Sequence, residues 1–386
     1  MTTAVIVDAI RTASGKGKPG GALSGFHPVD LLGTVLRTLV DRNGLDPAQV
    51  DDVIAGCLSQ VGEQSVNIAR NSLLAAGFPD SVPGTTVDRQ CGSSQQAAHF
   101  GAQGVIAGAY DIVIACGVEL MSKNPIGYAT LGMDNWGPKV HARYPDGLVG
   151  QGISAELIAA RWNLSREQLD AFSVRSHQLA AAADFSSEII PVGANFVDDE
   201  TVRPGTTLEG LGALQPAFHD RELGRRFPEI HWRVTAGNSS PLTDGASAVL
   251  IMSETRAAEL GLTPRARFHS FAVTGSDPIE MLTGVIPATR RILDRAGLTV
   301  DDIDTFEVNE AFACVPLAWQ KELGVDPARV NPRGGAIALG HALGSSGTRL
   351  LTTMVNQLEF IDGRYGLQVM CEGAGMANAT IIERIA

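Results

Sequence analysis

The chain has 386 residues, of which 44% are hydrophobic, 19% charged and only 5% aromatic. This composition excludes a disordered or fibrous protein, and the length predicts two or three domains. The formal net charge of −12 leaves no broad positive field. We therefore expect no nucleic-acid partner and no binding to anionic membranes.

Compartment and metal content are predicted from the apolar runs and the cysteines. No apolar run approaches the ~18 residues of a membrane-spanning helix, and the first residues lack the basic segment of a secretory signal. The five cysteines are widely spaced and include no C-x-x-C pair. This pattern predicts neither a disulfide framework nor a metal site, so we expect no membrane span and a cytoplasmic location.

The chain begins with a predicted buried strand, residues 4–10, followed by an amphipathic helix between Pro28 and Gly44 and a strand at 53–55. Gly44 is a natural helix stop. The segment 42–53, RNGLDPAQVDDV, returns as RAGLTVDDIDTF at 295–306, so that Gly44 corresponds to Gly297 at an offset of 253 residues.

Two further matches follow in the same order. Gly92-Ser93-Ser94 corresponds to 344–346 at an offset of 252, and the strand that contains Cys116 corresponds to the strand that contains Cys371 at an offset of 255. Such nearly constant offsets predict a duplicated β-α-β-α-β-β unit. We expect a mostly parallel, helix-covered sheet, with equivalent loops of the two copies facing one shared cleft.

The duplication also locates an insertion. The Cys371 strand is followed almost at once by a strand at 379–385, but in the first half the counterpart, 246–252, comes about 125 residues after Cys116. The insertion contains helical patterns at 153–162 and 166–183, the second with a capping-box start at Ser165 and Gln168. We therefore divide the chain into a first half (1–118 plus 243–265), an inserted loop or lid domain (119–242) and a second half (266–386).

Cys91 stands just before a predicted helix. The positive end of the helix dipole favours the thiolate there and lowers the pKa of the thiol. The dipole supplies only about 0.3–1 kcal/mol, so a partner base would still help. The alternative is a buried, inert cysteine.

Three other residues stand in loops that can carry chemistry. His341, in the glycine-dense loop 331–347, can take a proton from a thiol or serve as a structural hydrogen-bonding group. Cys371, at a strand end, can move protons or belong to the core. Asn309, at another strand end, can hold a water or polarise a carbonyl, or it can cap a helix. The 331–347 loop contains neither phosphate-binding motif.

Four loops together resemble the signature loops of the thiolases, a family of acetyl-CoA acyltransferases. They begin or end at the residues just named: Cys91-Gly-Ser-Ser-Gln-Gln-Ala, Asn309-Glu-Ala-Phe-Ala, Gly334-Gly-Ala-Ile-Ala-Leu-Gly-His341 and Cys371-Glu-Gly-Ala-Gly. The resemblance runs along essentially the whole chain. It implies an α/β fold of the duplicated, five-layered α/β/α/β/α type, with a lid-like insertion in the first half.

The resemblance also implies roles for individual residues. Cys91 would be the nucleophile that becomes acylated, His341 would activate it, and Cys371 would exchange a proton with the acetyl-CoA carbon. Asn309 would fix a water that forms one oxyanion hole with His341. The backbone N–H groups of Cys91 and Gly373 would form the other. The remaining two residues fall where the family contacts coenzyme A: Arg203 and Ser240.

Coenzyme A and acyl-CoA are then substrates, with no permanently bound cofactor, and the family forms homodimers and homotetramers. The run 90–96 resembles actinobacterial thiolases of fatty-acid and sterol-ring breakdown. It favours a degradative 3-ketoacyl-CoA thiolase, which releases acetyl-CoA and a shortened acyl-CoA. The alternatives are an acetoacetyl-CoA-forming acetyl-CoA acetyltransferase, a ketoacyl synthase and a non-enzymatic CoA- or lipid-binding homologue.

Several positions depart from the family pattern. Ser94 and the two glutamines after it replace a commoner Gly-containing sequence, and Ala342 stands where the family usually has Pro. Pro241 and Met376 are also unusual. None of these departures removes a catalytic atom, and we expect them to reshape the acyl pocket.

Overall fold

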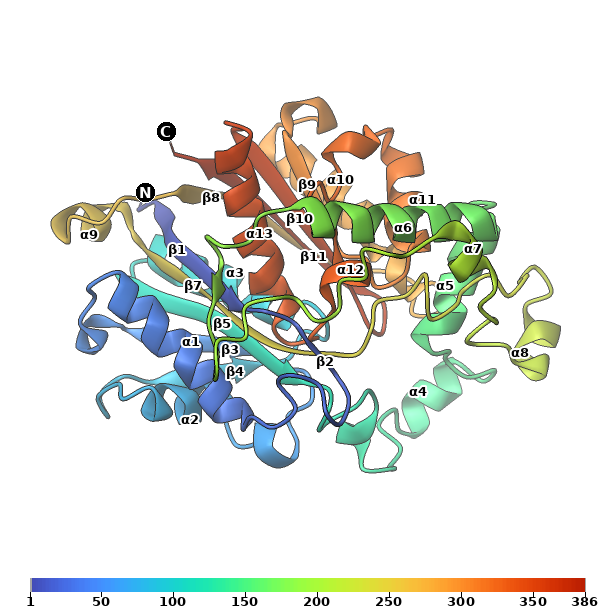
Figure 1. The fold of residues 1–386 in the computed structure, drawn as a ribbon, viewed down its shortest axis with the longest axis horizontal. Helices are drawn as coiled ribbons and strands as arrows, with labels where there is room; N and C mark the ends of the chain where they lie inside the picture. Colours follow the sequence, from blue (N-terminus) through green and yellow to red (C-terminus); the bar gives the residue numbers. More distant parts are fainter. Residues whose placement is uncertain (1, 386) are drawn as a thin grey trace.

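A computed structural model describes residues 2–385. Within them, eleven strands form one sheet whose main path runs β4-β3-β5-β7-β1-β8-β11-β10-β9, with β2 and β6 attached to β7 and β1 (Figure 1). The strands are β1 (Ala4–Thr12), β2 (Gly15–Lys16), β3 (Asp52–Gly56), β4 (Gly84–Val87), β5 (Ile112–Leu120), β6 (Ile189–Ile190), β7 (Thr243–Ser253), β8 (Ala266–Gly275), β9 (Thr305–Val308), β10 (Tyr365–Glu372) and β11 (Met376–Arg384).

The two halves repeat one strand order. From edge to centre the first half reads β4-β3-β5-β7-β1, and the second reads β9-β10-β11-β8. An isolated parallel bridge between Phe306 and Val330 stands beyond β9, where β4 stands in the first half. The halves meet where the starts of β1 and β8 pair, Val5 with Arg267 and Ile6 with Ala266. The predicted duplication is therefore present in the fold.

The sheet is mixed, so the expectation of a mostly parallel sheet is wrong. β3 is parallel to β4 and β5, and β9 is parallel to β10, but β7 and β11 are antiparallel to both of their neighbours on the main path. In the second half, a short connection explains why β10 and β11 are antiparallel. Residues 373–375 connect β10 to β11 by a tight turn, and a tight turn can join only antiparallel strands.

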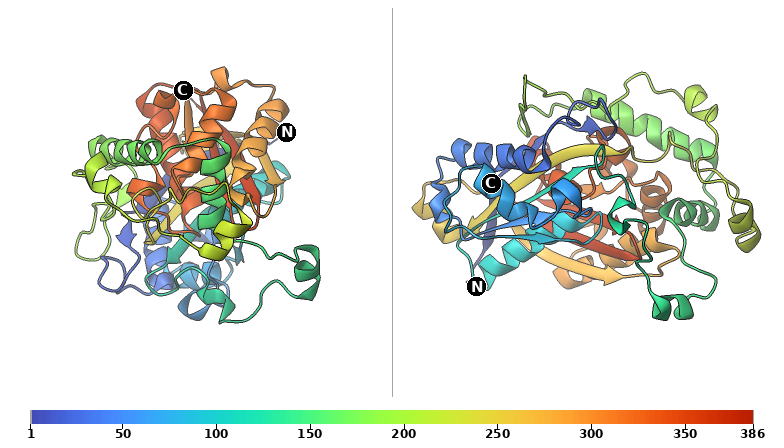
Figure 2. Two further views of the ribbon diagram at one scale, coloured as in Figure 1. Left: turned by 90° about the vertical axis from the view of Figure 1, so that its right-hand side faces the viewer. Right: turned by 90° about the horizontal axis from the view of Figure 1, so that it is seen from below.

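The helices complete five layers. α1 and α2 cover the outer face of the first half, α3 and α13 lie between the two halves, and α10 and α11 cover the outer face of the second (Figures 1 and 2). The helices are α1 (Pro28–Arg42), α2 (Ile68–Ala75), α3 (Ser93–Ile106), α4 (Pro138–Arg143), α5 (Gln151–Arg161), α6 (Arg166–Ala182), α7 (Leu208–Gly212), α8 (Arg221–Arg226), α9 (Glu254–Glu259), α10 (Val285–Ala296), α11 (Cys314–Leu323), α12 (Ala336–Leu339) and α13 (Ser346–Phe360).

The sequence explains the ends of the outer helices. Pro28 is the first residue of α1, where its missing N–H costs nothing, and the residues that α1 buries recur at helical spacing. Gly44 and Gly297 follow α1 and α10 with φ of 58° and 68°, a left-handed conformation that favours glycine. These glycines are the first pair of the predicted repeat, and both copies use them to end a helix.

The inner helices α3 and α13 start side by side. The backbone at Gly347 approaches so closely that a Cβ there would lie 2.0 Å from the backbone nitrogen of Gln95. The hydroxyl of Ser94 accepts a hydrogen bond from the backbone N–H of Thr348 at 3.0 Å. The loops that precede these two helices, one from each half, are thereby brought together.

The insertion between β5 and β7 is mostly loop. Its two predicted helices are α5 and α6, and the capping box of Ser165 and Gln168 is formed. Both helices pack against the second half, α5 on α11 and α6 on α12. α4, α7 and α8 were not predicted, and the segment around α4 stands out from the body of the molecule (Figure 2). Among the described residues, no helix combines the length and apolarity needed to cross a membrane. The division into three parts stays a prediction.

Candidate active site

Cys91 lies just before α3, whose N-cap is Gly92, and it borders a cavity of about 390 Å³. The thiol is 2% exposed. We call this space the Cys91 cavity. Both the first half and the insertion contribute to its walls, which are formed by Leu58, Asp88, Gln90, Cys91, Ile126, Gly127, Ala129, Thr130, Asn135, Gln151 and Leu343.

Burial raises the pKa of Cys91, and the nearby thiol of Cys371 and carboxyl of Glu372 raise it further. The side chain of Gln151 and the backbone of Gly373 favour the thiolate but do not outweigh burial. The expected lowering of this pKa is therefore wrong, because loss of hydration exceeds the ~0.3–1 kcal/mol that a helix dipole supplies. A base must take the proton as the sulfur reacts.

Asn309, His341 and Cys371 meet from three separate segments. The side-chain nitrogen of Asn309 lies 3.5 Å from His341 Nε2 and donates to Cys371 Sγ at 3.8 Å. Cys371 in turn lies close enough to Cys91 to affect its pKa. The structure thus brings together the four side chains that the sequence singled out.

The tautomer of His341 follows from its hydrogen bonds. The hydroxyl of Ser346 donates its single proton to the carbonyl of Ala342 at 2.8 Å, so it can only accept from His341 Nδ1, at 2.7 Å. Nδ1 therefore carries the proton and Nε2 presents its lone pair beside Asn309. Burial, with a smaller effect of Arg349, lowers the pKa of His341 to about 3, so the ring is neutral at physiological pH.

Cys371 is completely buried at the end of β10. Burial raises the pKa of its thiol to about 12, the Asn309 side chain acts in the opposite direction, and Glu372 adds to the rise. Burial also raises the pKa of Glu372 itself well above its ordinary value, which favours the neutral carboxyl. At neutral pH Cys371 is a proton donor rather than a thiolate.

Asn309 is not a helix cap, because α11 starts at Cys314 with Ala313 as its N-cap. It follows β9 directly, and its backbone N–H donates to the carbonyl of Val369 at 3.0 Å. Asn331 holds the end of β9 through two hydrogen bonds to Val308, at 2.8 and 2.9 Å. The Asn309 amide is therefore fixed in place by the sheet.

The two residues expected to contact coenzyme A lie in different surroundings. Ser240 is half-buried, and its backbone N–H donates to the carbonyl of Ala311, next to the Asn309 loop. Arg203 is exposed on a loop of the insertion, where its backbone N–H donates to His177 Nδ1 at 3.2 Å. Within residues 2–385, no hydrogen bond or ion pair joins Arg203 to the four loops.

Three of the unusual residues point away from the Cys91 cavity. Ser94 bonds α13, as described above, and Gln95 donates to the hydroxyl of Thr380 at 2.8 Å. Gln96 accepts from the side chain of Asn378 at 3.2 Å. These residues connect α3 to α13 and β11, and Ala342, Pro241 and Met376 also do not line the cavity. That these departures reshape the acyl pocket stays a prediction.

Sequence reasoning missed three residues next to the reactive sulfurs and imidazole. Ser346 is the first residue of α13, and His341 lies five residues earlier in the loop that leads into this helix. Gln151 begins α5 and reaches Cys91 from the insertion. Glu372, beside Cys371, lies so near α3 that a Cβ on Gly92 would be 1.9 Å from its carboxyl oxygen. Only the last was adjacent to a predicted residue.

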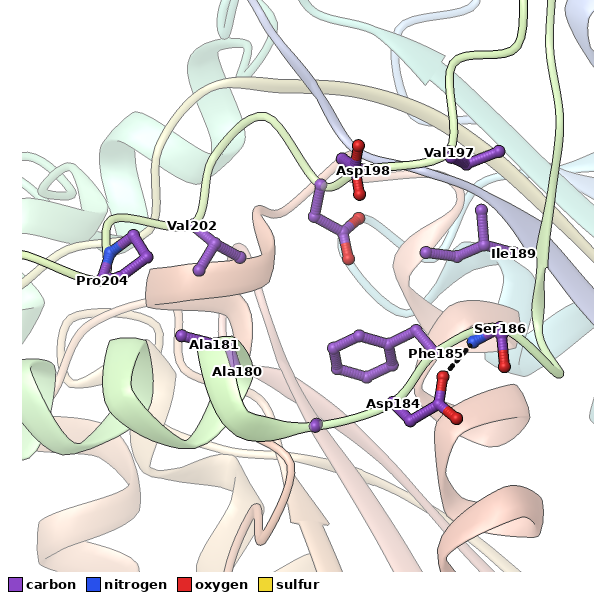
Figure 3. Close-up of a pocket in the computed structure, with 12 residues that line it drawn as sticks. Ala180, Ala181, Asp184, Phe185, Ser186, Ile189, Val197, Asp198, Val202 and Pro204 are labelled. Atoms are coloured by element: carbon purple, nitrogen blue, oxygen red, sulfur yellow. Dashed lines mark hydrogen bonds between the residues drawn. The ribbon is translucent and has the colours of Figure 1, made fainter.

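A larger hollow of about 630 Å³ lies elsewhere, between the end of α6 and the loop that leads to Pro204 (Figure 3). Phe185, Ile189 and Val202 form its apolar wall, and Asp184 and Asp198 lie at its rim. It contains no cysteine and no histidine. Its acidic groups disfavour a phosphate-bearing ligand, so we place the chemistry at the Cys91 cavity.

The chain matches known proteins along nearly its whole length. Residues 4–255 match the family described as thiolase, N-terminal domain, and residues 262–384 match thiolase, C-terminal domain. A relative from Mycobacterium tuberculosis, named steroid 3-ketoacyl-CoA thiolase FadA6, is 52% identical over 100% of this chain and 95% of its own length.

Other relatives and a solved structure agree with this match. A protein of Yersinia enterocolitica named 3-ketoacyl-CoA thiolase is 45% identical over the full length of both chains. The crystal structure of the Bacillus anthracis acetyl-CoA acetyltransferase superposes with a TM-score of 0.88 at 35% identity, covering 100% of this chain and 99% of that one.

Proposed function

The chain belongs to the thiolase family, and on this basis we propose that it is a degradative 3-ketoacyl-CoA thiolase. It would cleave a 3-ketoacyl-CoA with coenzyme A into acetyl-CoA and a shortened acyl-CoA. The observation that carries the proposal is the meeting of Asn309, His341 and Cys371, together with the closeness of Cys371 to Cys91, which borders the cavity.

In the first half-reaction, Cys91 attacks the 3-keto carbon while His341 Nε2 takes the thiol proton. This transfer is needed because burial disfavours a free thiolate at Cys91. The bond between carbons 2 and 3 then breaks, leaving the acyl group on Cys91 and the enolate of acetyl-CoA. Cys371 donates its proton to the enolate carbon, which releases acetyl-CoA and leaves a thiolate at Cys371.

In the second half-reaction, the Cys371 thiolate takes the proton of free coenzyme A, whose sulfur attacks the acyl-enzyme. The sulfur of Cys91 leaves and recovers its proton from His341, so every group returns to its starting state. A thiol with a pKa of about 12 suits this exchange, because its thiolate is a strong base.

Both half-reactions place negative charge on a carbonyl oxygen. We propose that a water held by Asn309, together with His341, stabilises one such oxygen, and that the backbone N–H groups of Cys91 and Gly373 stabilise the other. Each well-placed donor is worth about 10²–10³ in rate. Arg203 and Ser240 are proposed to contact coenzyme A.

The relatives named 3-ketoacyl-CoA thiolase, at 45–52% identity along the whole chain, favour this substrate class over acetoacetyl-CoA formation. Asn309 and Cys371 argue against a ketoacyl synthase. We further propose a cytoplasmic location, because the chemistry needs free thiols and all five cysteines are free. A homodimer or homotetramer is supported by β4, an edge strand whose outer backbone groups can pair with another copy.

The test is a thiolysis assay in which the enolate absorbance of a 3-ketoacyl-CoA is followed after coenzyme A is added. We expect its loss, with acetyl-CoA as one product and an acyl adduct on Cys91 by intact mass. A ketoacyl synthase would not consume the substrate in this direction, and a binding protein would leave it unchanged. Either result would overturn the proposal.

A further inference from the structure

The walls of the Cys91 cavity differ in polarity. Leu58, Ile126 and Leu343 form an apolar part of the wall. Polar side chains form another part, and among them are the amides of Gln90 and Gln151. A hydrocarbon chain in this cavity would gain nothing from the two amides, because it would displace water from their free polar atoms without offering a hydrogen bond in return.

Gln90 is held in place by the turn that precedes Cys91. Its backbone has a φ of 50°, which non-glycine residues rarely adopt, and its N–H donates to the Asp88 carboxylate at 2.6 Å. Its side-chain nitrogen lies 3.4 and 3.5 Å from the two oxygens of the same carboxylate. The nitrogen end of the amide is thereby occupied, and the carbonyl end, Oε1, is directed away from Asp88.

Gln151 approaches the same point from the insertion. As the first residue of α5 it is half-buried, and its side chain reaches the Cys91 thiol. A Cβ placed on Gly373 would lie 3.0 Å from Gln90 Oε1 and 3.4 Å from Gln151 Nε2. One hydrogen-bond acceptor and one donor therefore flank Gly373, beside the sulfur that would carry the acyl group.

We propose that the Cys91 cavity selects acyl groups that bear a further uncharged oxygen, a hydroxyl or a ketone, beyond the 3-keto group. Gln151 Nε2 donates to this oxygen, and Gln90 Oε1 accepts from it when it is a hydroxyl. The inference rests on the proposed thiolase function and names the class of acyl group within it.

Charge around the cavity excludes a carboxylate as the preferred group. Asp88 lines the cavity, whereas no Lys or Arg is among the lining residues. A carboxylate on the acyl chain would meet this acidic group without a cation to pair with. The apolar wall accommodates the hydrocarbon part of the same acyl group.

The experiment compares 3-ketoacyl-CoAs of equal length that are unsubstituted, hydroxylated, ketone-bearing or carboxylate-bearing, with the substituent at successive positions. We expect kcat/KM for the best hydroxyl or ketone substrate to exceed that of the unsubstituted one at least about tenfold, the equivalent of one good hydrogen bond. The carboxylate substrate should be poorer than the neutral ones.

Two variants assign the preference to the amides. Gln151→Met should bring the ratio of kcat/KM values close to one for either substituent, and Gln90→Leu should lower the ratio for the hydroxyl substrate while leaving that for the ketone substrate unchanged. Gln103→Met, an exposed glutamine on α3, is the matched control and should leave the ratio unchanged. Gln90 and Gln151 lie in different segments, so one variant can fold when the other does not. The substrate comparison uses the unaltered chain and does not depend on either variant.

These experiments distinguish failure of this inference from failure of the proposed function. Thiolysis with equal or better kcat/KM for the unsubstituted or carboxylate-bearing chain overturns this inference and leaves the proposed function standing. A preference that survives both variants also overturns it, because the amides would then not be its cause. Absence of both turnover and Cys91 acylation with every substrate overturns the proposed function and this inference together.

Discussion

The strand β5 of the first half and the strand β10 of the second carry equivalent cysteines with different surroundings. Cys116 and Cys371 are both completely buried, and burial raises the pKa of each thiol. Cys116 lies in the middle of β5, and its thiol donates to the carbonyl of Ile54 at 3.7 Å. Cys371 lies one residue before the end of β10 and accepts from Asn309.

If Cys371 exchanges protons as proposed, burial alone does not separate a structural cysteine from a catalytic one. β5 continues through Gly117 to Leu120 before the insertion begins, so Cys116 stays inside the sheet. β10 ends at Glu372 and turns at once, which leaves Cys371 at the edge where the loops of both halves meet. The position of the strand end decides which copy can contribute to chemistry.

The largest effect is expected from the one reactive group that the first half supplies. Cys91→Ala should lower thiolysis at least about 10³-fold and remove the acyl adduct, because no other group can form the acyl-enzyme. Steady-state kinetics and intact mass measure this. Cys57→Ala, which changes another buried cysteine of the first half, is the control. An acyl adduct in the Cys91 variant would show that a second-half thiol is the nucleophile.

Substitution of the two equivalent cysteines should affect different properties, turnover for Cys371 and stability for Cys116. Cys371→Ala should lower thiolysis about 10²–10⁴-fold, the usual worth of a proton-transfer group, while Cys91 is still acylated by an activated acyl-CoA. Cys116→Ala should retain turnover but lose about 1–3 kcal/mol of unfolding free energy. Kinetics, intact mass and urea unfolding on both variants test the comparison. Equal loss of turnover in the two would contradict it.

The equivalent serines at the starts of α3 and α13 give a smaller contrast. Ser346→Ala removes the acceptor for His341 Nδ1 and should lower kcat about tenfold with little change in KM. Ser94→Ala removes a bond between helices and should affect stability alone. Ser346 is a positioning residue, so the split between kcat and KM is the informative readout. A purely structural role would instead lower the melting temperature of both variants and leave kcat per folded molecule unchanged.

The smallest effect concerns α3 itself, which carries His99 where α13 carries Leu351. Burial lowers the pKa of His99 to about 3, below the ~6.5 of the unfolded chain, so the unfolded state binds the proton first as pH falls. This contribution to stability is present above about pH 6.5 and is lost progressively toward about pH 3.

His99→Gln should therefore reduce the loss of unfolding free energy between about pH 7.5 and 5 by roughly 2 kcal/mol. Gln can still accept from Thr380, the hydroxyl that lies 2.7 Å from His99. Urea unfolding at several pH values measures the change, and the exposed His231→Gln is the control. An unchanged pH dependence in the His99 variant would show that the buried ring is protonated without cost.

Much of this arrangement could be predicted because it is encoded locally. Gly44 and Gly297 end equivalent helices, and three of the four candidate catalytic side chains stand at strand ends or a helix start, whereas His341 stands in the loop before α13. The features that could not be predicted from the sequence depend on contacts between residues far apart in the chain. The pKa of Cys91 is set by burial, and Gln151 reaches it from an insertion without a recognisable motif. The short helices α4, α7 and α8 offer too few turns for periodicity to reveal them.

The position of β7 between β5 and β1 has a consequence for synthesis on the ribosome. The first strand can complete its pairing only with β7 and β8, which begin at Thr243 and Ala266. At about 5–20 residues per second, its unpaired backbone N–H and C=O groups wait on the order of tens of seconds for these partners. During that interval the nascent chain presents an open β edge, which makes it a natural client for holding chaperones and a source of aggregation when expression outpaces them.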